Sequence, residues 1–219
     1  MLRAGPNGMG RERTMSLNRA DRDLVGLSVL ALLLSGPKHT YEMHRMMITT
    51  RKDFVTGLPR SMYHAVERLL RDGHLIPVET SRTGSRPERT VYAVTDRGRD
   101  EVQGRLERLL ATPEADSTLL SAALSFIICL PPARAGAALR TRLEALCARI
   151  GDLESDLAAA SAQLPRILLL EVEQELAALR SQRIWLEGVL NDITNGHLDW
   201  PADLSQLTEN MEGRDAESD

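Results

Sequence analysis

The chain has 219 residues, of which 42% are hydrophobic, 26% charged and 3% aromatic, so it is long enough for one large or two small domains with a real core. The net charge of −4 is uneven, because residues 1–110 carry 19 Lys and Arg against 13 Asp and Glu, and residues 111–219 carry 8 against 18. Its two distant cysteines and short apolar runs argue against a disulfide scaffold, a cysteine zinc site and a membrane span, and the first 23 residues lack the apolar block of a signal peptide.

The front half is predicted to hold three helices before its first strand. Residues 1–20 are rich in Gly and Arg and are expected to form a disordered arm. Leucines and valines between Asp23 and Leu34 then predict a helix that is apolar on most of its surface, and Gly36-Pro37 ends it. A second helix is expected from Thr40 to Met47. A third begins near Arg60 and stops at Gly73.

After Gly73 the sequence pattern changes from one typical of helices to one typical of strands. Residues 74–78 and 89–95 are rich in β-formers, and the turn-forming segment 80–88 between them predicts a hairpin with a long basic tip. Thr95 is then the expected cap of a fourth helix. The order of three helices, strand, basic loop, strand and helix is the layout of a winged helix-turn-helix over residues 21–112.

The back half, residues 113–200, is predicted to be helical throughout. Residues 115–130 are apolar enough for a buried helix, which two prolines close. Beyond it, apolar residues alternate in steps of four and three on both sides of Pro165, as in two paired helices. Such an antiparallel hairpin would leave apolar surface for a second subunit. The residues expected to hold this homodimer are Leu139, Leu143, Leu146, Ile150, Leu153, Leu157, Leu176, Leu179, Leu186 and Leu190. Residues 201–219 are expected to be a disordered acidic tail.

The third helix has the residue types that a helix in the major groove of DNA needs. Arg60, Ser61 and His64 offer donors and acceptors at its N-terminal end, with apolar residues behind them. Tyr63 is a candidate for a phosphate contact, and Arg68 lies one turn beyond His64. The alternative is an ordinary amphipathic helix whose polar face is solvated.

The expected hairpin tip is also basic. Arg82, Arg86 and Arg89 are opposed only by Glu88, which favours a wing on the DNA backbone or in the minor groove. A solvated basic turn would show the same composition. The combination with the third helix is more specific than either element alone.

Four ordered blocks between Leu24 and Gly98 resemble the PadR family of transcriptional regulators. The blocks are Gly36–Met43, Pro59–Leu69, Asp72–Ile76 and Tyr92–Gly98. The helical remainder is similar in pattern to the C-terminal dimerisation domain of the longer, virulence-activator-like PadR branch, most clearly at residues 180–187. The fold expected is therefore mainly α: an N-terminal winged helix-turn-helix with a two-stranded wing, followed by an antiparallel, coiled-coil-like dimerisation domain.

The resemblance implies a homodimer that places two recognition helices on a pseudo-palindromic operator, with Tyr41, Ser61 and Tyr63 on the DNA. The DNA-binding candidates are together Thr40, Tyr41, Arg60, Ser61, Tyr63, His64, Arg68, Arg82, Arg86 and Arg89. The family often has Gly where this chain has Thr40 or Arg60, and Pro where it has His64. Because Arg60 and His64 add hydrogen-bond donors, the operator preference is expected to differ from that of relatives.

We expect a cytoplasmic, sequence-specific repressor that a small-molecule effector releases, with Trp185 or Trp200 lining an effector pocket unless they are simply core residues. The five histidines show no metal-ligand spacing, and no nucleotide-binding loop or catalytic constellation is present, so no enzyme, metal or cofactor is expected. One rival is a winged-helix adaptor that binds a protein instead of a duplex. Another is an enzyme with a helical C-terminal domain, which would need a polar constellation that the sequence lacks.

Overall fold

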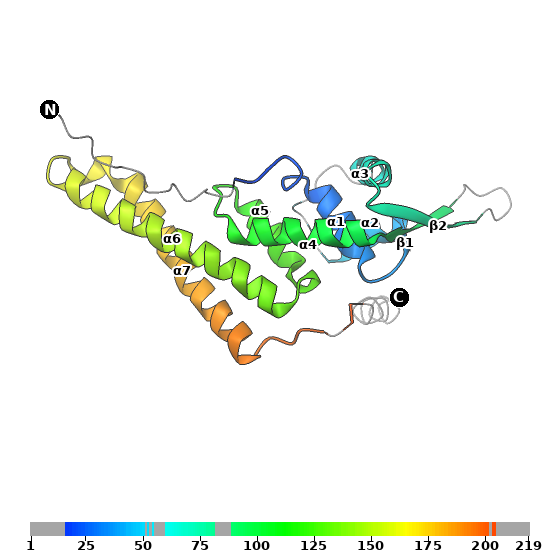
Figure 1. Cartoon of the computed structure of the whole chain (residues 1–219). Helices are drawn as coiled ribbons and strands as arrows, with labels where there is room; N and C mark the ends of the chain where they lie inside the picture. Colours follow the sequence, from blue (N-terminus) through cyan, green and yellow to red (C-terminus); the bar gives the residue numbers. More distant parts are fainter. Residues whose placement is uncertain are drawn as a thin grey trace, which may run out of the picture.

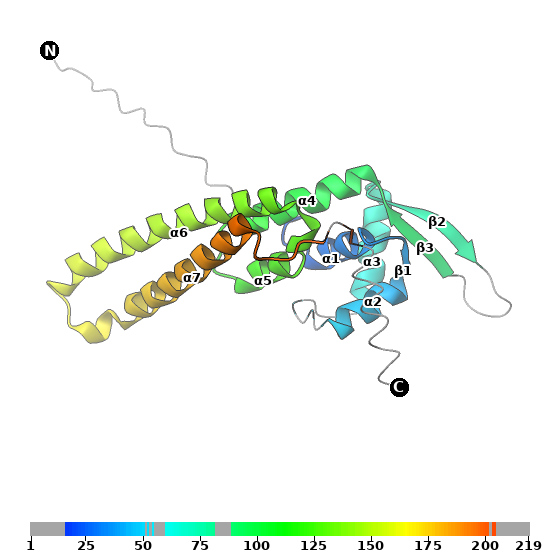
Figure 2. The same ribbon diagram turned by 90° about the horizontal axis from the view of Figure 1, so that it is seen from below.

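The computed structural model describes residues 16–50, 52, 54, 60–81, 89–201, 203 and 204. Most of the expected arm and tail therefore lies outside the described residues. In chain order the elements are α1 (Leu24–Leu33), β1 (Lys38–His39), α2 (Thr40–Thr49), α3 (Arg60–Arg71), β2 (Leu75–Ser81), β3 (Arg89–Val94), α4 (Asp96–Ala111), α5 (Ser117–Ser125), η1 (Ile127–Cys129), α6 (Pro132–Ser161), η2 (Arg166–Leu168) and α7 (Leu170–Asn195). A bundle of shorter helices carries a β-wing at one end, and the α6–α7 hairpin extends from the other (Figures 1 and 2).

The described strands form one antiparallel sheet in the order β1-β3-β2. The expected two-stranded wing is therefore joined by a third, two-residue strand, in which Lys38 pairs with Tyr92 and His39 with Val91. The register between β2 and β3 shifts between Pro77 and Glu79. Because β1 leads directly into α2, this extra pairing fixes the start of α2 against the wing.

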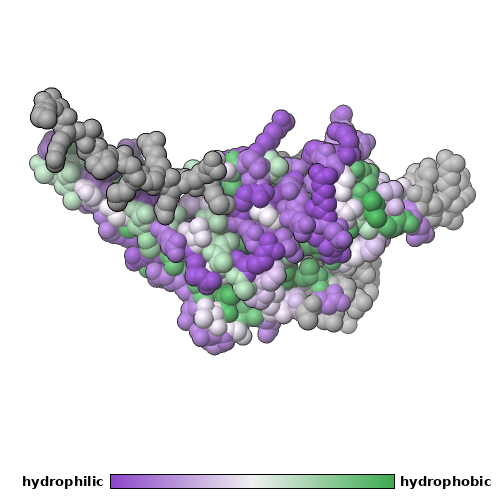
Figure 3. Space-filling view, viewed as in Figure 1, coloured by the Kyte–Doolittle hydropathy of each residue, from purple (hydrophilic) through white to green (hydrophobic). Residues whose placement is uncertain are grey.

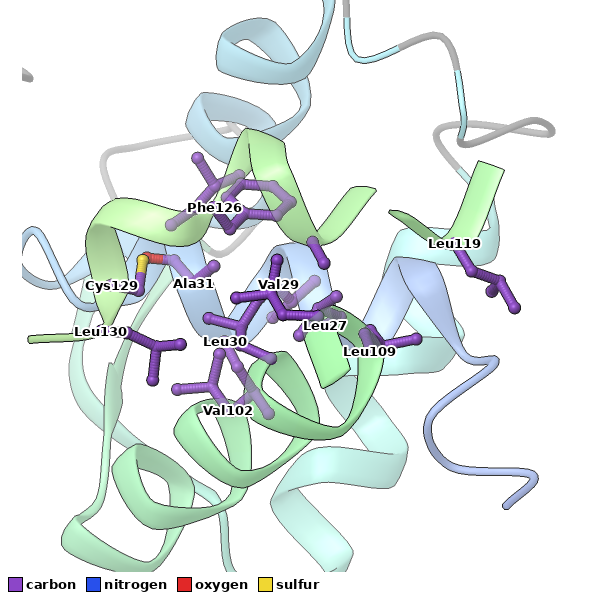
Figure 4. Close-up of a cluster of buried hydrophobic side chains, with 14 of the residues drawn as sticks. Leu27, Val29, Leu30, Ala31, Val102, Leu109, Leu119, Phe126, Cys129 and Leu130 are labelled. Carbon is purple, nitrogen blue, oxygen red and sulfur yellow. The ribbon is translucent and has the colours of Figure 1, made fainter. Parts of the chain in front are cut away.

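Helix α1 is the centre of the core, as its apolar sequence predicts. Leu27, Val29 and Leu30 are fully buried, and side chains from α4, α5 and η1 surround them (Figure 4). The same hydrophobic cluster continues into α6 and α7. The core is therefore continuous across residue 112, and the division at that point stays a prediction made from the sequence pattern.

The helix expected over residues 115–130 is interrupted. Phe126 leaves the helical conformation, with φ −120° and ψ 14°, and its ring is buried, so α5 ends at Ser125 and η1 follows. After α6, η2 forms the corner beyond Pro165, and α7 returns antiparallel to α6 (Figure 2). The expected fold class is confirmed: a mainly helical chain with a winged helix-turn-helix and a C-terminal helical hairpin.

The leucine seam lies inside this hairpin rather than on its surface. Seven of the ten residues expected to hold a dimer are buried within the single chain, and the other three pack against the same clusters. A heptad-like period predicts that a helix is paired, but it does not say which chain supplies the partner. The large apolar side chains that stay exposed on the hairpin are Leu164, Ile167, Leu168 and Leu170 at the corner, and Ile184 and Trp185 on α7.

Candidate nucleic-acid interface

Helix α3 divides cleanly into a buried and an exposed face. Its buried residues are Met62, Ala65, Val66 and Leu69. Arg60, Tyr63 and His64 are exposed, and Ser61 is half-buried beside them. His64 Nδ1 lies 3.7 Å from a carboxylate oxygen of Glu67, which is also exposed. The first two turns of α3 thus present the polar groups that the sequence predicts for a groove-facing helix.

The start of α2 lies against the wing and exposes one aromatic ring. Tyr41 is 69% exposed. The backbone N–H of His39 donates to Glu42 Oε2 at 2.7 Å, and His39 Nδ1 lies 3.1 Å from the carbonyl oxygen of Thr90 on β3. Thr40, by contrast, is only 7% exposed, because it opens α2 on the inner side of this junction. The structure therefore places Tyr41, but not Thr40, where a duplex could reach it.

Arg68 is engaged within the protein. Its guanidinium donates to the Asp23 carboxylate, which also accepts from the backbone N–H of Gly26 at 3.1 Å and so caps α1. Arg105 on α4 lies 3.8 Å from the same carboxylate and donates to Glu101 at 2.6 Å. The geometry gives Arg68 the task of joining α3 to α1, while its expected contact with DNA stays a prediction. Helical spacing within α3 carries no signal of a partner 45 residues away.

The structure describes only a small part of the expected basic wing. Arg82 and Arg86 lie outside the described residues, and only the backbone of Arg89 is described, as the first residue of β3. On the described part of the wing, Ile76 and Val78 of β2 are about half exposed. Hydrophilic residues cover most of the neighbouring face, with a hydrophobic group beside the wing (Figure 3). The basic contribution of the tip stays a prediction.

A cavity of about 130 Å³ lies between the winged helix-turn-helix and the α5–η1 segment. Its apolar lining includes Leu32, Met46, Phe126, Ile128 and Cys129. Lys52 is its cationic group: the Nζ atom lies 3.3 Å from the carbonyl oxygen of Ser125 and 5.0 Å from the centroid of the Phe126 ring. Because these residues come from distant segments, no local motif could have revealed the cavity.

Burial alters both titratable groups of this cavity. It lowers the pKa of the Lys52 ammonium from its usual value and raises the pKa of the Cys129 thiol to about 12. The thiol is therefore protonated and unreactive at neutral pH. Trp185 lies on α7 and does not line the cavity, whereas Trp200 is half-buried and donates its indole N–H to the Leu130 carbonyl at 2.9 Å. The expectation that a tryptophan lines the effector pocket finds no support in this geometry.

Within the described part of the chain, no group of three or more His, Cys, Asp or Glu side chains is placed to hold a metal ion. Among the described helices, none has both the length and the apolar character needed to cross a bilayer.

Comparison with known proteins identifies the winged part. Residues 29–104 match the model of the transcriptional regulator PadR-like family, which confirms the resemblance seen in the sequence. This family consists of regulators and not of enzymes. No match was found among curated proteins.

Solved structures give similarity at low identity. PadR of Bacillus subtilis in complex with operator DNA is 23% identical, covering 78% of this chain and 99% of that chain, with a TM-score of 0.38. The same protein in complex with p-coumaric acid gives 22% identity, the same coverage and a TM-score of 0.34. A PadR-like regulator of Bacillus cereus is 18% identical, again with coverage of 78% and 99%, and a TM-score of 0.34.

Proposed function

We propose that this chain, whose residues 29–104 are a PadR-like domain, is a transcriptional repressor that binds a pseudo-palindromic operator as a homodimer. Residues 21–112 would bind DNA and residues 113–200 would hold the two copies together. The observation that carries the proposal is the division of α3: its apolar face is locked into the core while Arg60, Tyr63 and His64 project from its first two turns. A repressor of this kind acts by occupying the operator.

The proposed contacts divide by chemistry. Arg60, Ser61 and His64 would read base edges in the major groove, where donor and acceptor patterns differ between base pairs. Tyr41 and Tyr63 would hold phosphates through their hydroxyls. The wing arginines at positions 82, 86 and 89 would lie on the backbone or in the minor groove. Thr40 and Arg68 are left out, since the first is buried and the second is bound to Asp23.

The direct test is fluorescence anisotropy with a labelled duplex from the region upstream of the protein's own gene, against a scrambled duplex of equal length. If about four to six phosphates per subunit are neutralised, the logarithm of the affinity should fall with the logarithm of salt concentration by about 0.9 per phosphate. Equal weak binding to both duplexes, without retention on heparin, would instead favour the protein–protein adaptor.

Replacing Arg60 by alanine should relax base preference. We expect the affinity for the operator to fall by about tenfold to a hundredfold, with a smaller loss on scrambled DNA, because a base contact contributes about 1–3 kcal/mol of discrimination. Arg140→Ala is the matched control, as it removes the same charge from an exposed position on α6. Equal losses on both duplexes would show that Arg60 contacts only phosphate.

A second copy is the proposed partner of the exposed apolar side chains on the hairpin. Ile184 is 65% exposed and Trp185 is 45% exposed on α7, while Ile167 and Leu168 are exposed at the corner. The hairpin's internal seam is already filled by its own two helices, so these residues are the apolar surface that remains for a partner. A two-fold axis through such a surface would pair two DNA-binding domains on a palindromic site.

The cavity beside Lys52 is the proposed effector site. Its volume and apolar lining suit a small aromatic or aliphatic body, and the ammonium suits an anionic end group. The Bacillus subtilis relative was crystallised with p-coumaric acid, an aromatic carboxylic acid, which is therefore the first probe. Binding there, between the DNA-binding helices and the α5–η1 segment, would alter how the two parts pack.

We expect Lys52→Met to weaken the binding of p-coumaric acid by at least about tenfold in calorimetry, while Lys52→Arg retains most of it. A bound carboxylate would raise the lowered pKa of Lys52, so the binding gained from that charge is complete below the pKa of the free protein and is lost as the pH rises through the higher pKa of the complex. The uncharged methyl ester of the same probe should show neither the pH dependence nor the effect of Lys52→Met.

A further inference from the structure

The carboxyl end of α4 is closed by a buried side chain from another helix. Arg142 of α6 is only 3% exposed. Its Nε donates to the carbonyl of Leu110 at 2.7 Å, and one terminal nitrogen donates to the carbonyls of Leu109 at 2.9 Å and Thr112 at 2.5 Å. The last carbonyls of a helix have no partner within the helix and carry its negative dipole end. One guanidinium thus satisfies three of them.

The charge of Arg142 persists at neutral pH. Burial lowers the pKa of its guanidinium to about 10, and the charge of Glu114 acts in the opposite direction. A buried cation of this kind is tolerated only where fixed dipoles replace its hydration. Here the three carbonyls at the end of α4 supply those dipoles, so Arg142 and α4 depend on each other.

A second contact lies earlier along the same pair of helices. Arg134 of α6 donates to Glu107 of α4 at 2.5 Å and to Gln103 at 2.6 Å. The two arginines are eight residues apart on α6, or about 12 Å along its axis. Together with the apolar packing between the two helices, these two polar contacts fix the direction of α6 relative to α4. The contact made by Arg142 is buried, whereas the contact made by Arg134 is partly exposed to solvent.

Helix α4 is also part of the DNA-binding unit. It follows β3 after Thr95, its N-cap, and packs against α1, which Asp23 links to α3. The direction of α6 relative to α4 is therefore its direction relative to the recognition helix. We propose that Arg142 is a positioning residue that sets the orientation of the winged helix-turn-helix on the α6–α7 hairpin. Its consequence for DNA rests on the proposed function.

A small change at this joint has a large effect at a distance. Helix α6 continues for 19 residues beyond Arg142 to Ser161, which is about 28 Å. A tilt of about 5° would move its end by about 2.5 Å, close to the rise of about 3.4 Å per base pair along DNA. If the angle between α4 and α6 varied, the distance between the two recognition helices of a dimer would therefore vary as well.

The test measures the distance between the winged helix-turn-helix and the α6–α7 hairpin, and it needs no DNA. Nitroxide labels on Ser161→Cys at the exposed far end of α6, in a Cys147→Ser background, and on Arg71→Cys at the exposed end of α3 report the distance between the two parts. Labelled protein is diluted with unlabelled protein to suppress distances between copies. Cys129 is buried with a pKa of about 12 and should not react with the label.

Double electron–electron resonance is then compared between the parent, Arg142→Gln and the control Arg149→Gln, which removes an exposed guanidinium one heptad further along α6. We expect Arg142→Gln to widen the distance distribution at least about twofold while helical circular dichroism and sedimentation stay unchanged. Arg149→Gln should match the parent. If Arg142→Gln is too unstable, Arg142→Lys gives the readout, with an intermediate width, because an ammonium can bond these carbonyls but cannot span all three at once. Unchanged widths in both Arg142 variants would overturn the proposal.

An operator series with half-sites moved by one or two base pairs supplies the functional arm. The parent should prefer one spacing by about tenfold or more, and Arg142→Gln should reduce that preference to less than about threefold. Should the parent bind no duplex, the proposed function fails while the resonance result still decides the role of Arg142. A widened joint with an unchanged spacing preference would overturn the link to DNA.

Discussion

Replacing Gly98 by alanine should lower the free energy of unfolding by about 3 kcal/mol, the loss expected when a side chain is forced into a packed interior. A Cβ at this position would lie 2.3 Å from the carbonyl oxygen of His74 and 2.7 Å from Val94 Cγ2. The first of these is a backbone atom, and it also accepts from the Thr95 hydroxyl at 3.1 Å, so it cannot move aside alone. The first turn of α4 is in contact with the segment that leaves α3, and only glycine fits between them.

Gly104→Ala on the same helix is the control for the Gly98 variant. There the nearest atom to an added Cβ is the flexible end of Arg108, 3.2 Å away. Alanine should thus be tolerated and could add up to about 1 kcal/mol by reducing the freedom of the unfolded chain. Urea unfolding followed by circular dichroism measures both variants. A Gly98→Ala midpoint equal to that of the parent would contradict the packing described between α4 and His74.

The largest functional loss is expected from Ile184→Asp. If two copies meet through this face of α7, a buried carboxylate there should separate them, because an unpaired charge in an apolar interface is costly. Each DNA-binding domain would then bind its half-site alone, and the affinity for the full operator should fall by about 10²- to 10⁴-fold. Sedimentation velocity and anisotropy on the same samples measure the two effects together.

Ser155→Asp is the matched control for this variant. It introduces the same charge at an exposed position on α6, a different helix from the one that carries Ile184 and Trp185. This variant should remain dimeric and bind DNA as the parent does. An Ile184→Asp protein that sediments as a dimer would show that the copies meet elsewhere, with the exposed apolar corner beyond Pro165 the next surface to test.

The sequence was sufficient to predict the elements whose ends are set by local chemistry. Arg60 and Gly73 bracket α3 as expected, and Thr95 caps α4 through the N–H of Gly98. The wing was also predicted from its alternation, although the two residues of β1 are too few to give a period. Phe126 broke an expected helix because its ring is accommodated in the core, which no local pattern reports.

The site was harder to predict, since partners distant in the chain decide what a polar residue does. Arg68 has the spacing of a groove-facing residue, yet Asp23, which is 45 positions earlier, binds it. Thr40 is a polar residue of a type that could contact DNA, but the junction between α2 and the wing buries it. Arg142 sits in a leucine-rich stretch that predicts helix pairing, and nothing in its neighbourhood reveals the carbonyls that it meets. Tertiary packing, and not the local sequence pattern, decides what these three residues contact.

If this chain is the regulator that we propose, the pairing of Arg68 with Asp23 has a consequence for how it can change its target. Arg68, which links α3 to α1, is part of the scaffold, whereas Arg60 and His64 take no part in that contact. Under the proposed function, DNA specificity and folding would then depend on separate positions of one short segment. A lineage could retune the DNA sequence it reads by exchanging the exposed pair, without passing through intermediates that fail to fold.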